Sequence, residues 1–242
     1  MIQQVILCAR AAHALPQLIV EPIIVCGESE RATVIEQLLR AGAAAKAMLI
    51  EPRRRGTAAA LTLAAVHAVT LDDPVLLVVP SSTSVLQNGA LQRAEVLAAR
   101  GALVAFGVPP AAPLTGRAYI RARAEYVDAF VAQPDAATAK AYFDAGGCLW
   151  STGIFALRAS VWIDVIGSLR PDIFKTCERA YRKGKREGAF LRIDAAAFAA
   201  CPAQSVECAV MEKIAGELSA LETMVVRLDA GWSGAGCYAN AA

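Results

Sequence analysis

Histidine is scarce in this chain, with only His13 and His67, and none of its seven cysteines forms a Cys-x-x-Cys pair. A zinc site needs several closely spaced cysteine or histidine ligands, so the sequence predicts no metal site of this kind. An odd number of scattered cysteines indicates reduced thiols rather than structural disulfides. We therefore expect a cytoplasmic protein whose cysteines are small buried residues.

Long apolar runs and a strong charge of either sign are also lacking. The apolar run from Pro74 to Pro80 has the length of a strand and is far short of the roughly 20 residues that cross a bilayer. The first residues, Met1 to Leu7, carry no basic segment and do not indicate a signal peptide. With a net charge of +2, the chain has no excess of basic side chains to attract a polyanion. We expect neither a membrane protein nor a protein that binds nucleic acid.

The sequence does contain an ample supply of core-forming residues, since 56% of its 242 residues are hydrophobic. In the first half, short β-rich runs alternate with segments of helical period. The predicted strands are Ile2–Leu7, Ile23–Cys26, Met48–Ile50, Val75–Val79 and Leu103–Phe106. The predicted helices are Ser29–Arg40, Thr57–Val69 and Asn88–Arg100, with Ser29 and Thr57 as N-caps and Gly42 and Gly101 as C-terminal stops. This alternation predicts an α/β fold built on a parallel sheet.

The second half has a different pattern. Two alternating runs, Ala118–Arg123 and Tyr126–Val131, predict an antiparallel hairpin. A helix is predicted from Pro134-Asp135 to Asp144, where Gly146 and Gly147 end it, and another from Pro171 to Arg182. Ile154–Leu157 is a candidate strand, and the charged stretch Lys183–Gly188 is interpreted as a solvated loop.

Short motifs occur in five segments of the chain. They are Glu51–Ala58, Pro80–Thr83, Thr115–Ile120, Leu149–Phe155, and Ala209–Lys213 followed by Leu228–Ser233. In this order and spacing they resemble the nucleotidyltransferase domain of bacterial mannose-1-phosphate guanylyltransferases, within the sugar-phosphate nucleotidyltransferase superfamily. The resemblance runs from about Val5 to Tyr238.

The resemblance implies a Rossmann-like, GT-A-type α/β domain. Its sheet is expected to be mixed and mainly parallel, with helices on both faces and a small antiparallel hairpin region. A single domain over 1–242 is implied, with a nucleotide-binding half at 1–107, a sugar-binding half at 108–242 and no isomerase domain.

The resemblance also implies a reaction and a set of contacts. Proteins of this family join a sugar 1-phosphate to a nucleoside triphosphate, release pyrophosphate and use Mg²⁺. The implied nucleotide contacts are Arg55, Thr57, Ala58, Pro80 and Ser82. The implied sugar contacts are Gly116, Tyr119, Ser151 and Gly153.

This chain departs from the family pattern where the reaction is carried out. The glycine-rich phosphate loop is replaced by Cys8–Pro16, which has no glycine, is followed by a shortened connection and places Ala14 where the family has arginine. Ser82 and Gly234 stand where the family has its metal-binding aspartates. Serine is a poor ligand for a hard cation, and glycine offers no side chain. On the sugar side, Ala132 and Ser151 replace a glutamate and an asparagine.

We therefore expect a shortened, degenerate and catalytically impaired relative with no confidently assigned catalytic residue, metal ligand or cofactor. It would act by binding a nucleotide, a sugar nucleotide of the GTP or GDP-mannose class, or a partner protein in polysaccharide precursor metabolism. Removal of a single preorganised electrostatic group costs roughly 3–4 kcal/mol of transition-state stabilisation, and several are lost together here.

Two alternatives remain open. The first is an active enzyme whose Mg²⁺ site is rebuilt from Asp72, Asp73, Glu51 or Asp229. Asp72 and Asp73 precede their strand and are expected at the wrong end of the sheet, because ligands gather at the carboxyl ends of strands. The second alternative is a regulatory subunit that forms a homo-oligomer or a heteromer with an intact homologue.

Several charged residues have a functional and a structural interpretation. The run Arg53–Arg55 before a helix could hold an anion or be a solvated stretch. Arg10, Arg117, Arg121 and Arg123 could form a basic pocket, but an exposed strand face is favoured for the last three. His13 is interpreted as a surface residue and Glu212-Lys213 as a structural pair.

Overall fold

The computed structural model describes residues 22–40, 42, 44–80, 88–215 and 221–228. The predicted strand Ile2–Leu7 lies outside these residues, as do Arg10, His13, Ala14, Ser82, Asp229 and Gly234. The described elements form a mixed α/β fold, so the predicted fold class is confirmed.

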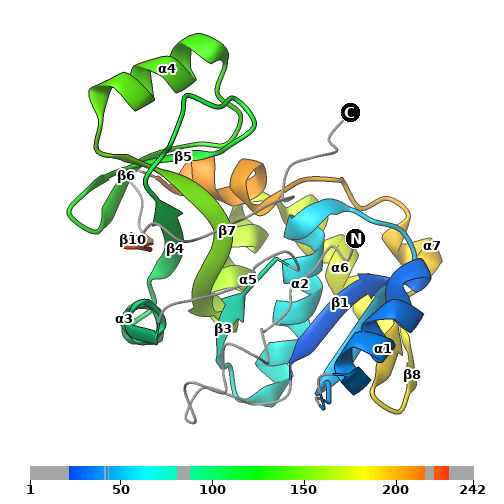
Figure 1. The fold of residues 1–242 in the computed structure, drawn as a ribbon. Coiled ribbons are helices and arrows are strands. Elements are labelled where there is room, and N and C mark those ends of the chain that lie inside the picture. Colours follow the sequence, from blue (N-terminus) through cyan, green and yellow to red (C-terminus); the bar gives the residue numbers. More distant parts are fainter. Residues whose placement is uncertain (1–21, 41, 43, 81–87, 216–220, 229–242) are drawn as a thin grey trace.

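One sheet has four strands in the order β1-β2-β9-β8. They are β1 (Ile23–Gly27), β2 (Ala47–Glu51), β9 (Phe190–Arg192) and β8 (Lys185–Glu187). β1, β2 and β9 run parallel, and β8 runs antiparallel to β9. α1 (Arg31–Arg40) packs on the face formed by the side chains of Ile24, Cys26, Met48 and Ile50. The other face packs against α2 (Gly56–Ala68) in the main core (Figure 1).

The second sheet has six strands in the order β3-β7-β4-β10-β6-β5. They are β3 (Val75–Val78), β7 (Cys148–Arg158), β4 (Leu103–Val108), β10 (Thr223–Arg227), β6 (Tyr126–Val131) and β5 (Tyr119–Arg123). β7 runs antiparallel to both β3 and β4, while β4 and β10 are parallel. β3, β4 and β10 therefore all point the same way, and their carboxyl ends lie on one edge of the sheet.

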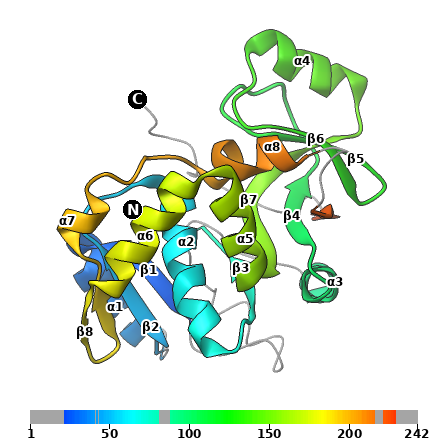
Figure 2. The ribbon, with the colours of Figure 1, turned by 180° about the vertical axis from the view of Figure 1, so that it is seen from behind.

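Helices cover both faces of the six-stranded sheet (Figures 1 and 2). α3 (Asn88–Ala99) packs on one face, and α5 (Ala159–Leu169) lies with α2 and α6 (Pro171–Arg182) on the other. α4 (Ala136–Ala145) lies above the β5–β6 hairpin. The remaining helical turns are short: η2 (Glu28–Glu30), η3 (Val69–Leu71), α7 (Ala195–Phe198), the π-helical η4 (Glu207–Met211) and α8 (Glu212–Ile214).

α2 is the central helix of the core and is rich in alanine. Small side chains let the surrounding sheet and helices approach it closely, so nearly the whole helix is buried. Its one buried hydroxyl group is satisfied, since Thr62 donates to the carbonyl oxygen of Ala58 (2.7 Å) and accepts from the indole nitrogen of Trp162 (3.0 Å). No helix among the described residues is long and apolar enough to span a membrane.

Most predicted elements are confirmed. The hairpin and the helix Pro171–Arg182 have the predicted bounds to within a residue, and Gly101 follows α3 with a positive φ of 98°. The predicted strand Ile154–Leu157 is the second half of the longer β7. Cys26, Cys148, Cys177 and Cys201 are buried free thiols, as predicted, and Cys208 is half-buried.

Three local predictions are wrong. Ser29 lies inside η2, whose N-cap is Gly27. Thr57 lies inside α2, whose N-cap is Arg55, because its hydroxyl group bonds to another segment instead. The stretch Lys183–Gly188 contains β8, since its backbone pairs with β9 even though its charged side chains are exposed.

Candidate functional site

An irregularity in β7 shapes the first part of the site. The pairing of β4 with β7 shifts between Ala105 and Gly107, and the residues of β7 near Gly153 bulge out of the ladder. Thr152 holds this bulge, since its hydroxyl donates to the carbonyl oxygen of Phe106 (2.9 Å) and accepts from the amide of Ile154 (3.2 Å). Bulges of this kind commonly lie next to active sites, where they redirect the chain.

Gly153 is required by this geometry. Its φ is +73°, a conformation that L side chains rarely adopt, and a Cβ atom there would lie 3.3 Å from Cγ of Pro80 and 3.9 Å from Oε1 of Glu207. Pro80 lies two residues after the end of β3, so the segment that follows this strand, the β7 bulge and the carboxylate of Glu207 come together around Gly153.

Glu207 is the site residue that the sequence reasoning missed. It is 5% exposed and is the first residue of a π-helical turn, a distortion that occurs frequently at functional sites. Its only sequence signal is its position two residues before the motif segment Ala209–Lys213. Glu207 therefore places a buried carboxylate beside Gly153, whose other close neighbour is Pro80.

A connecting segment, residues 199–207, joins this carboxylate to the turn at the start of α2. We call it the bridging segment; in Figures 1 and 2 it passes from α7 across the molecule to α8. The amide of Ala58 donates to the carbonyl oxygen of Gln204 (3.1 Å), and the amide of Gln204 donates to that of Arg55 (3.1 Å). The amide of Val206 donates to the hydroxyl of Thr57 (3.0 Å).

The α2 turn and the bridging segment are in van der Waals contact at Gly56. Its φ is +79°, and a Cβ atom there would lie 2.3 Å from the carbonyl oxygen of Gln204. The guanidinium group of Arg55 also donates to the carbonyl oxygen of Ala199 (2.5 Å). The resemblance implies that Arg55, Thr57 and Ala58 contact the nucleotide. All three residues are therefore also hydrogen-bonded to the bridging segment. Arg54, next to them, forms an ion pair with Glu30.

The residues expected to contact the sugar lie in different environments. Ser151 is fully buried, its hydroxyl accepts from the amide of Gly153 (3.3 Å), and both belong to the bulged strand. Tyr119 is also fully buried, where its ring stacks on that of Tyr142 with the centroids 5.8 Å apart. Gly116 is exposed in the turn before β5. The structure thus brings Ser151 and Gly153 together and places Tyr119 in the core.

Glu51 is a second buried carboxyl group, at the carboxyl end of β2 and 2% exposed. Its Oε1 atom has no hydrogen-bond partner among the described residues. Burial raises the pKa of Glu51 to about 8, with a further contribution from the charge of Cys201, and Arg54 acts in the opposite direction. Glu51 is therefore largely protonated at neutral pH and is a poor metal ligand in that state.

The other residues considered as metal ligands lie elsewhere. Asp73 precedes β3, where it accepts hydrogen bonds from the amide and the hydroxyl of Ser160 (both 2.7 Å), and Asp72 is beside it. Both are at the amino end of β3, opposite to Pro80, as predicted. Within the described ranges, no group of three or more histidine, cysteine or acidic residues is arranged to hold a metal ion.

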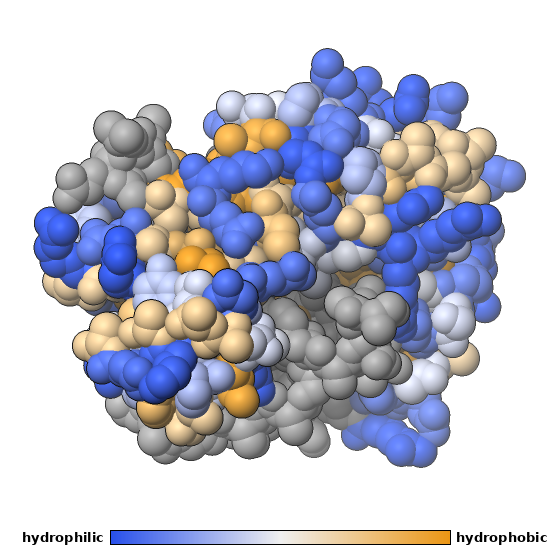
Figure 3. All heavy atoms as spheres, turned by 90° about the horizontal axis from the view of Figure 1, so that it is seen from above, coloured by the Kyte–Doolittle hydropathy of each residue, from blue (hydrophilic) through white to orange (hydrophobic). Residues whose placement is uncertain are grey.

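The interpretation as an exposed strand face is correct for Arg121 and Arg123, which are exposed on β5. It is wrong for Arg117, which precedes the strand, is half-buried and lies over the ring of Trp150, 5.7 Å from its centroid. The interpretation of Glu212-Lys213 as structural agrees with the structure. Glu212 accepts a hydrogen bond from the amide of Ala132 (2.8 Å), which ties α8 to the end of β6. In the view from above, apolar side chains lie in groups between the hydrophilic ones on the described surface (Figure 3).

The family model described as "Nucleotidyl transferase" matches residues 2–237. The "Xanthan biosynthesis protein XanB" of Xanthomonas campestris is 40% identical over 239 residues, which cover 95% of this chain and 48% of the relative. The "Mannose-1-phosphate guanylyltransferase ManC" of Salmonella typhimurium is 35% identical, with 90% of this chain and 48% of the relative covered. The chain spans about half the length of the curated relatives it matches.

A solved structure is also similar. The crystal structure described as "mannose-6-phosphate isomerase from Helicobacter pylori" superposes with a TM-score of 0.81 at 25% sequence identity. The match covers 92% of this chain and 87% of that one.

Proposed function

Because the chain belongs to the nucleotidyl transferase family, we propose that it binds a guanosine nucleotide or GDP-mannose and that its magnesium-dependent guanylyl transfer is impaired. Relatives named for mannose-1-phosphate guanylyl transfer and for xanthan biosynthesis support a role in polysaccharide precursor metabolism. The observation that carries the binding proposal is the convergence of Pro80, Gly153 and Glu207 at the carboxyl end of β3.

The sugar half of the ligand would lie against the β7 bulge. A glycine with positive φ leaves main-chain atoms accessible to a ligand, and the neighbouring carboxylate of Glu207 can accept hydrogen bonds from sugar hydroxyl groups. This chain has Ala132 where the family pattern has a glutamate, so one carboxylate of the sugar site is missing. Glu207 would supply a carboxylate to the proposed ligand site instead.

The nucleotide half would lie over the α2 turn. The bridging segment already satisfies the amide of Ala58 and the hydroxyl of Thr57, so these two groups are less available to phosphate oxygens. The exposed side of the turn, which carries Arg53, remains for the base and ribose. Arg55 and Thr57 would then contribute by fixing the shape of the turn.

The proposed impairment of guanylyl transfer follows from the residues that replace the family's metal-binding and phosphate-binding side chains. Ser82 and Gly234 replace the carboxylates that would hold Mg²⁺, and Ala14 replaces a basic group of the phosphate loop. Without these groups the negative charge that develops on the triphosphate during transfer is poorly neutralised. Binding of the product, GDP-mannose, needs less neutralisation of negative charge than the transfer step. Binding can therefore persist without these groups.

A second candidate function is retained transfer activity with Glu207 in the metal site. Mg²⁺ is often held by one or two carboxylates together with substrate phosphates, so a single well-placed carboxylate fits part of this requirement. Glu207 would then hold Mg²⁺, which would supply charge neutralisation at the phosphates. The buried position of Glu207 next to Gly153 favours this candidate over one based on Asp72 or Asp73.

Two measurements test these proposals. Isothermal titration with GDP-mannose, and with ADP-glucose for comparison, should give saturable binding that prefers GDP-mannose. A coupled assay of pyrophosphate release from GTP and mannose 1-phosphate should remain at background with and without Mg²⁺. Robust metal-dependent turnover would overturn the impairment and support the second candidate, and absence of GDP-mannose binding would overturn the binding proposal.

A further inference from the structure

Two cysteines face each other where the bridging segment packs against α6. Cys177 lies on α6, and Cys201 lies in the bridging segment just after α7. Their sulfur atoms are 3.9 Å apart, and the side chains are 0% and 1% exposed. Among the described residues, no other two cysteine sulfur atoms are in such contact.

The surroundings of the pair distinguish the two thiols. The hydrogen bond between the two thiols lowers the pKa of Cys201, burial raises it, and the positive charges of Arg55 and Arg170 lower it. The same hydrogen bond, together with burial, raises the pKa of Cys177. Of the two thiols, Cys201 is therefore the one that ionises more readily.

Glu51 supports this arrangement. Its carboxyl group is electrostatically coupled to Cys201, and burial raises its pKa to about 8. In the protonated form it adds no negative charge next to a thiolate at Cys201. The charges that face Cys201 are therefore positive, from Arg55 and Arg170, except for Asp172, which acts in the opposite sense.

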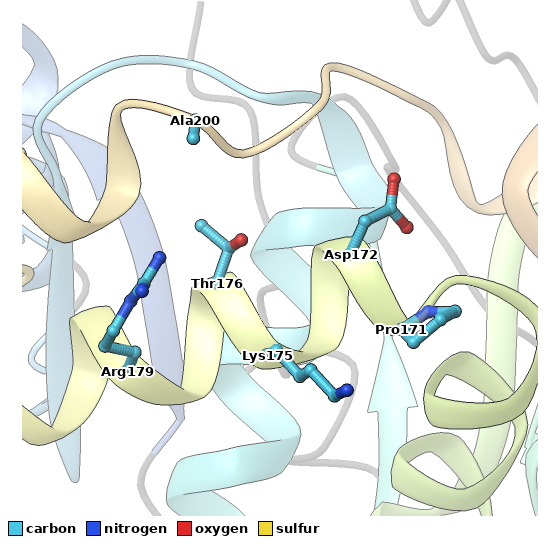
Figure 4. A pocket seen from close by; sticks show the side chains of 6 residues that line it. All are labelled: Pro171, Asp172, Lys175, Thr176, Arg179 and Ala200. Carbon is cyan, nitrogen blue, oxygen red and sulfur yellow. The ribbon is translucent and has the colours of Figure 1, made fainter.

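A surface hollow reaches the residues next to both cysteines. It has a volume of about 640 Å³ and is lined by α6 and by Ala200 (Figure 4). Thr176 precedes Cys177, and Ala200 precedes Cys201, and the two lie opposite each other across the hollow. Cys177 and Cys201 themselves are buried and do not line the hollow, so a small solute there is separated from the sulfur atoms by the lining residues.

We propose that Cys177 and Cys201 are an oxidisable dithiol that hydrogen peroxide converts to an intramolecular disulfide. The Cys201 thiolate attacks one peroxide oxygen, the O–O bond breaks, and the departing hydroxide takes a proton from solvent to leave as water. Cys201 is now a sulfenic acid. Cys177 then attacks its sulfur, the S–O bond breaks, and a second water leaves with the Cys177 proton. Two thiols and one peroxide give one disulfide and two waters.

The disulfide would act on the candidate ligand site. A disulfide bond is about 2.05 Å long, so the two sulfur atoms must approach each other from their 3.9 Å separation, and the bridging segment moves where rotation of the side chains does not close this gap. The bridging segment bonds to Arg55, Thr57 and Ala58, so its displacement changes the α2 turn. This second step rests on the proposed function, because its readout is the affinity for GDP-mannose; the formation of the disulfide does not.

The chemical step is tested on the full chain by peroxide treatment, alkylation of the remaining thiols and peptide mapping by mass spectrometry. A linked peptide pair containing Cys177 and Cys201 is expected. In the Cys177→Ser variant, Cys201 should accumulate as a sulfenic acid that dimedone traps, and in Cys201→Ser neither product should form. Cys26→Ser and Cys148→Ser are matched controls, since both remove a buried thiol elsewhere and should leave the linkage unchanged.

Three results would overturn the proposal: no Cys177–Cys201 linkage under peroxide, linkage of either cysteine to a different one, or dimedone labelling of Cys177 instead of Cys201. Thermal melts show which variants fold, and alanine variants replace any serine variant that does not. For the second step, oxidised chain should bind GDP-mannose at least about fivefold differently from reduced chain, and dithiothreitol should reverse the change. Equal affinities of the oxidised and reduced chain for GDP-mannose would overturn only the effect of the disulfide on ligand binding. If neither form binds GDP-mannose, the proposed function fails while the mapped disulfide still stands.

Discussion

The amide of Ala58 donates a 3.1 Å hydrogen bond to the carbonyl oxygen of Gln204. This bond satisfies one of the amides in the first turn of α2 that a helix leaves without an internal partner. A side-chain cap would normally do this, but Arg55 at the N-cap position makes no such bond. The start of α2 is therefore completed by a segment that is remote in sequence, and the shape of the turn depends on that segment.

The contact at Gly56 gives the first prediction. Gly56→Ala should lower the free energy of unfolding by more than about 2 kcal/mol, because the left-handed conformation alone costs about 1–2 kcal/mol for an L residue. The remainder comes from the Cβ atom 2.3 Å from the Gln204 oxygen. Gly188→Ala is the control, since its φ is also positive (63°) but its Cβ would meet nothing within 4 Å. Urea denaturation of both variants measures the difference; equal losses would contradict the close contact.

Glu51 gives a prediction about pH. Its pKa is about 8 in the folded chain against an ordinary value of 4.5, so between these values the folded state holds one more proton than the unfolded state. The contribution of Glu51 to the free energy of unfolding is therefore fully present below pH 4.5. As the pH rises from there to about 8, this contribution is lost, and the free energy of unfolding falls by about 1.4 kcal/mol per pH unit. Glu51→Gln cannot ionise and should remove this slope.

The measurement for Glu51 is urea denaturation in reducing buffer at pH 5, 6, 7 and 8. The difference between the original chain and Glu51→Gln isolates this group from its neighbours Cys201, Arg54 and Glu30, which are present in both. Glu36→Gln, on the exposed face of α1, is the matched control and should leave the slope unchanged. A constant difference across the four pH values would show that Glu51 ionises normally.

Glu207 gives a prediction about ligand affinity. If its carboxylate accepts a hydrogen bond from the ligand, Glu207→Gln should weaken binding of GDP-mannose by about tenfold or more, because hydrogen bonds to charged groups contribute about 1.5–3 kcal/mol. Glu187→Gln removes a carboxylate from the exposed β8 and should leave the affinity unchanged. Isothermal titration measures the affinity of both variants for GDP-mannose. Equal affinities would show that Glu207 does not bind the ligand.

The buried contact between Trp162 and Thr62 gives a prediction about stability. Thr62→Val keeps the shape of the side chain but leaves the indole N–H of Trp162 without its acceptor, which costs about 1–3 kcal/mol. The control is Thr70→Val, where the lost hydroxyl is exposed and bonds only to the carbonyl oxygen of His67. Chemical denaturation should show the larger loss for Thr62→Val. A smaller loss than in the control would mean that the indole finds another acceptor.

Local signals in the sequence were sufficient for much of the fold. Pro171 as the opening residue of a helix predicts α6, and alternation of side-chain type predicts the β5–β6 hairpin. Lys185–Glu187 was not recognised as a strand because all three side chains are charged, and its pairing with β9 is a property of the backbone.

The candidate site was less predictable, because its parts come together only in three dimensions. The motif around Gly153 was visible in the sequence, but the bulge that requires a positive φ depends on pairing with β4. A π-helical turn brings Glu207 near Gly153, and no residue pattern in the sequence predicts such a turn. The contact between Cys177 and Cys201 likewise depends on how α6 and the bridging segment pack, and their spacing in the sequence did not indicate it.

The charged strand β8 has a consequence for the chain in a crowded solution. It forms one border of the four-stranded sheet, and Lys185, Arg186 and Glu187 are all exposed. A second molecule that added a strand there would have to strip water from these charges, which opposes the open-ended stacking that leads to fibrils. We expect this border to help keep neighbouring molecules separate while the chain is being made and concentrated.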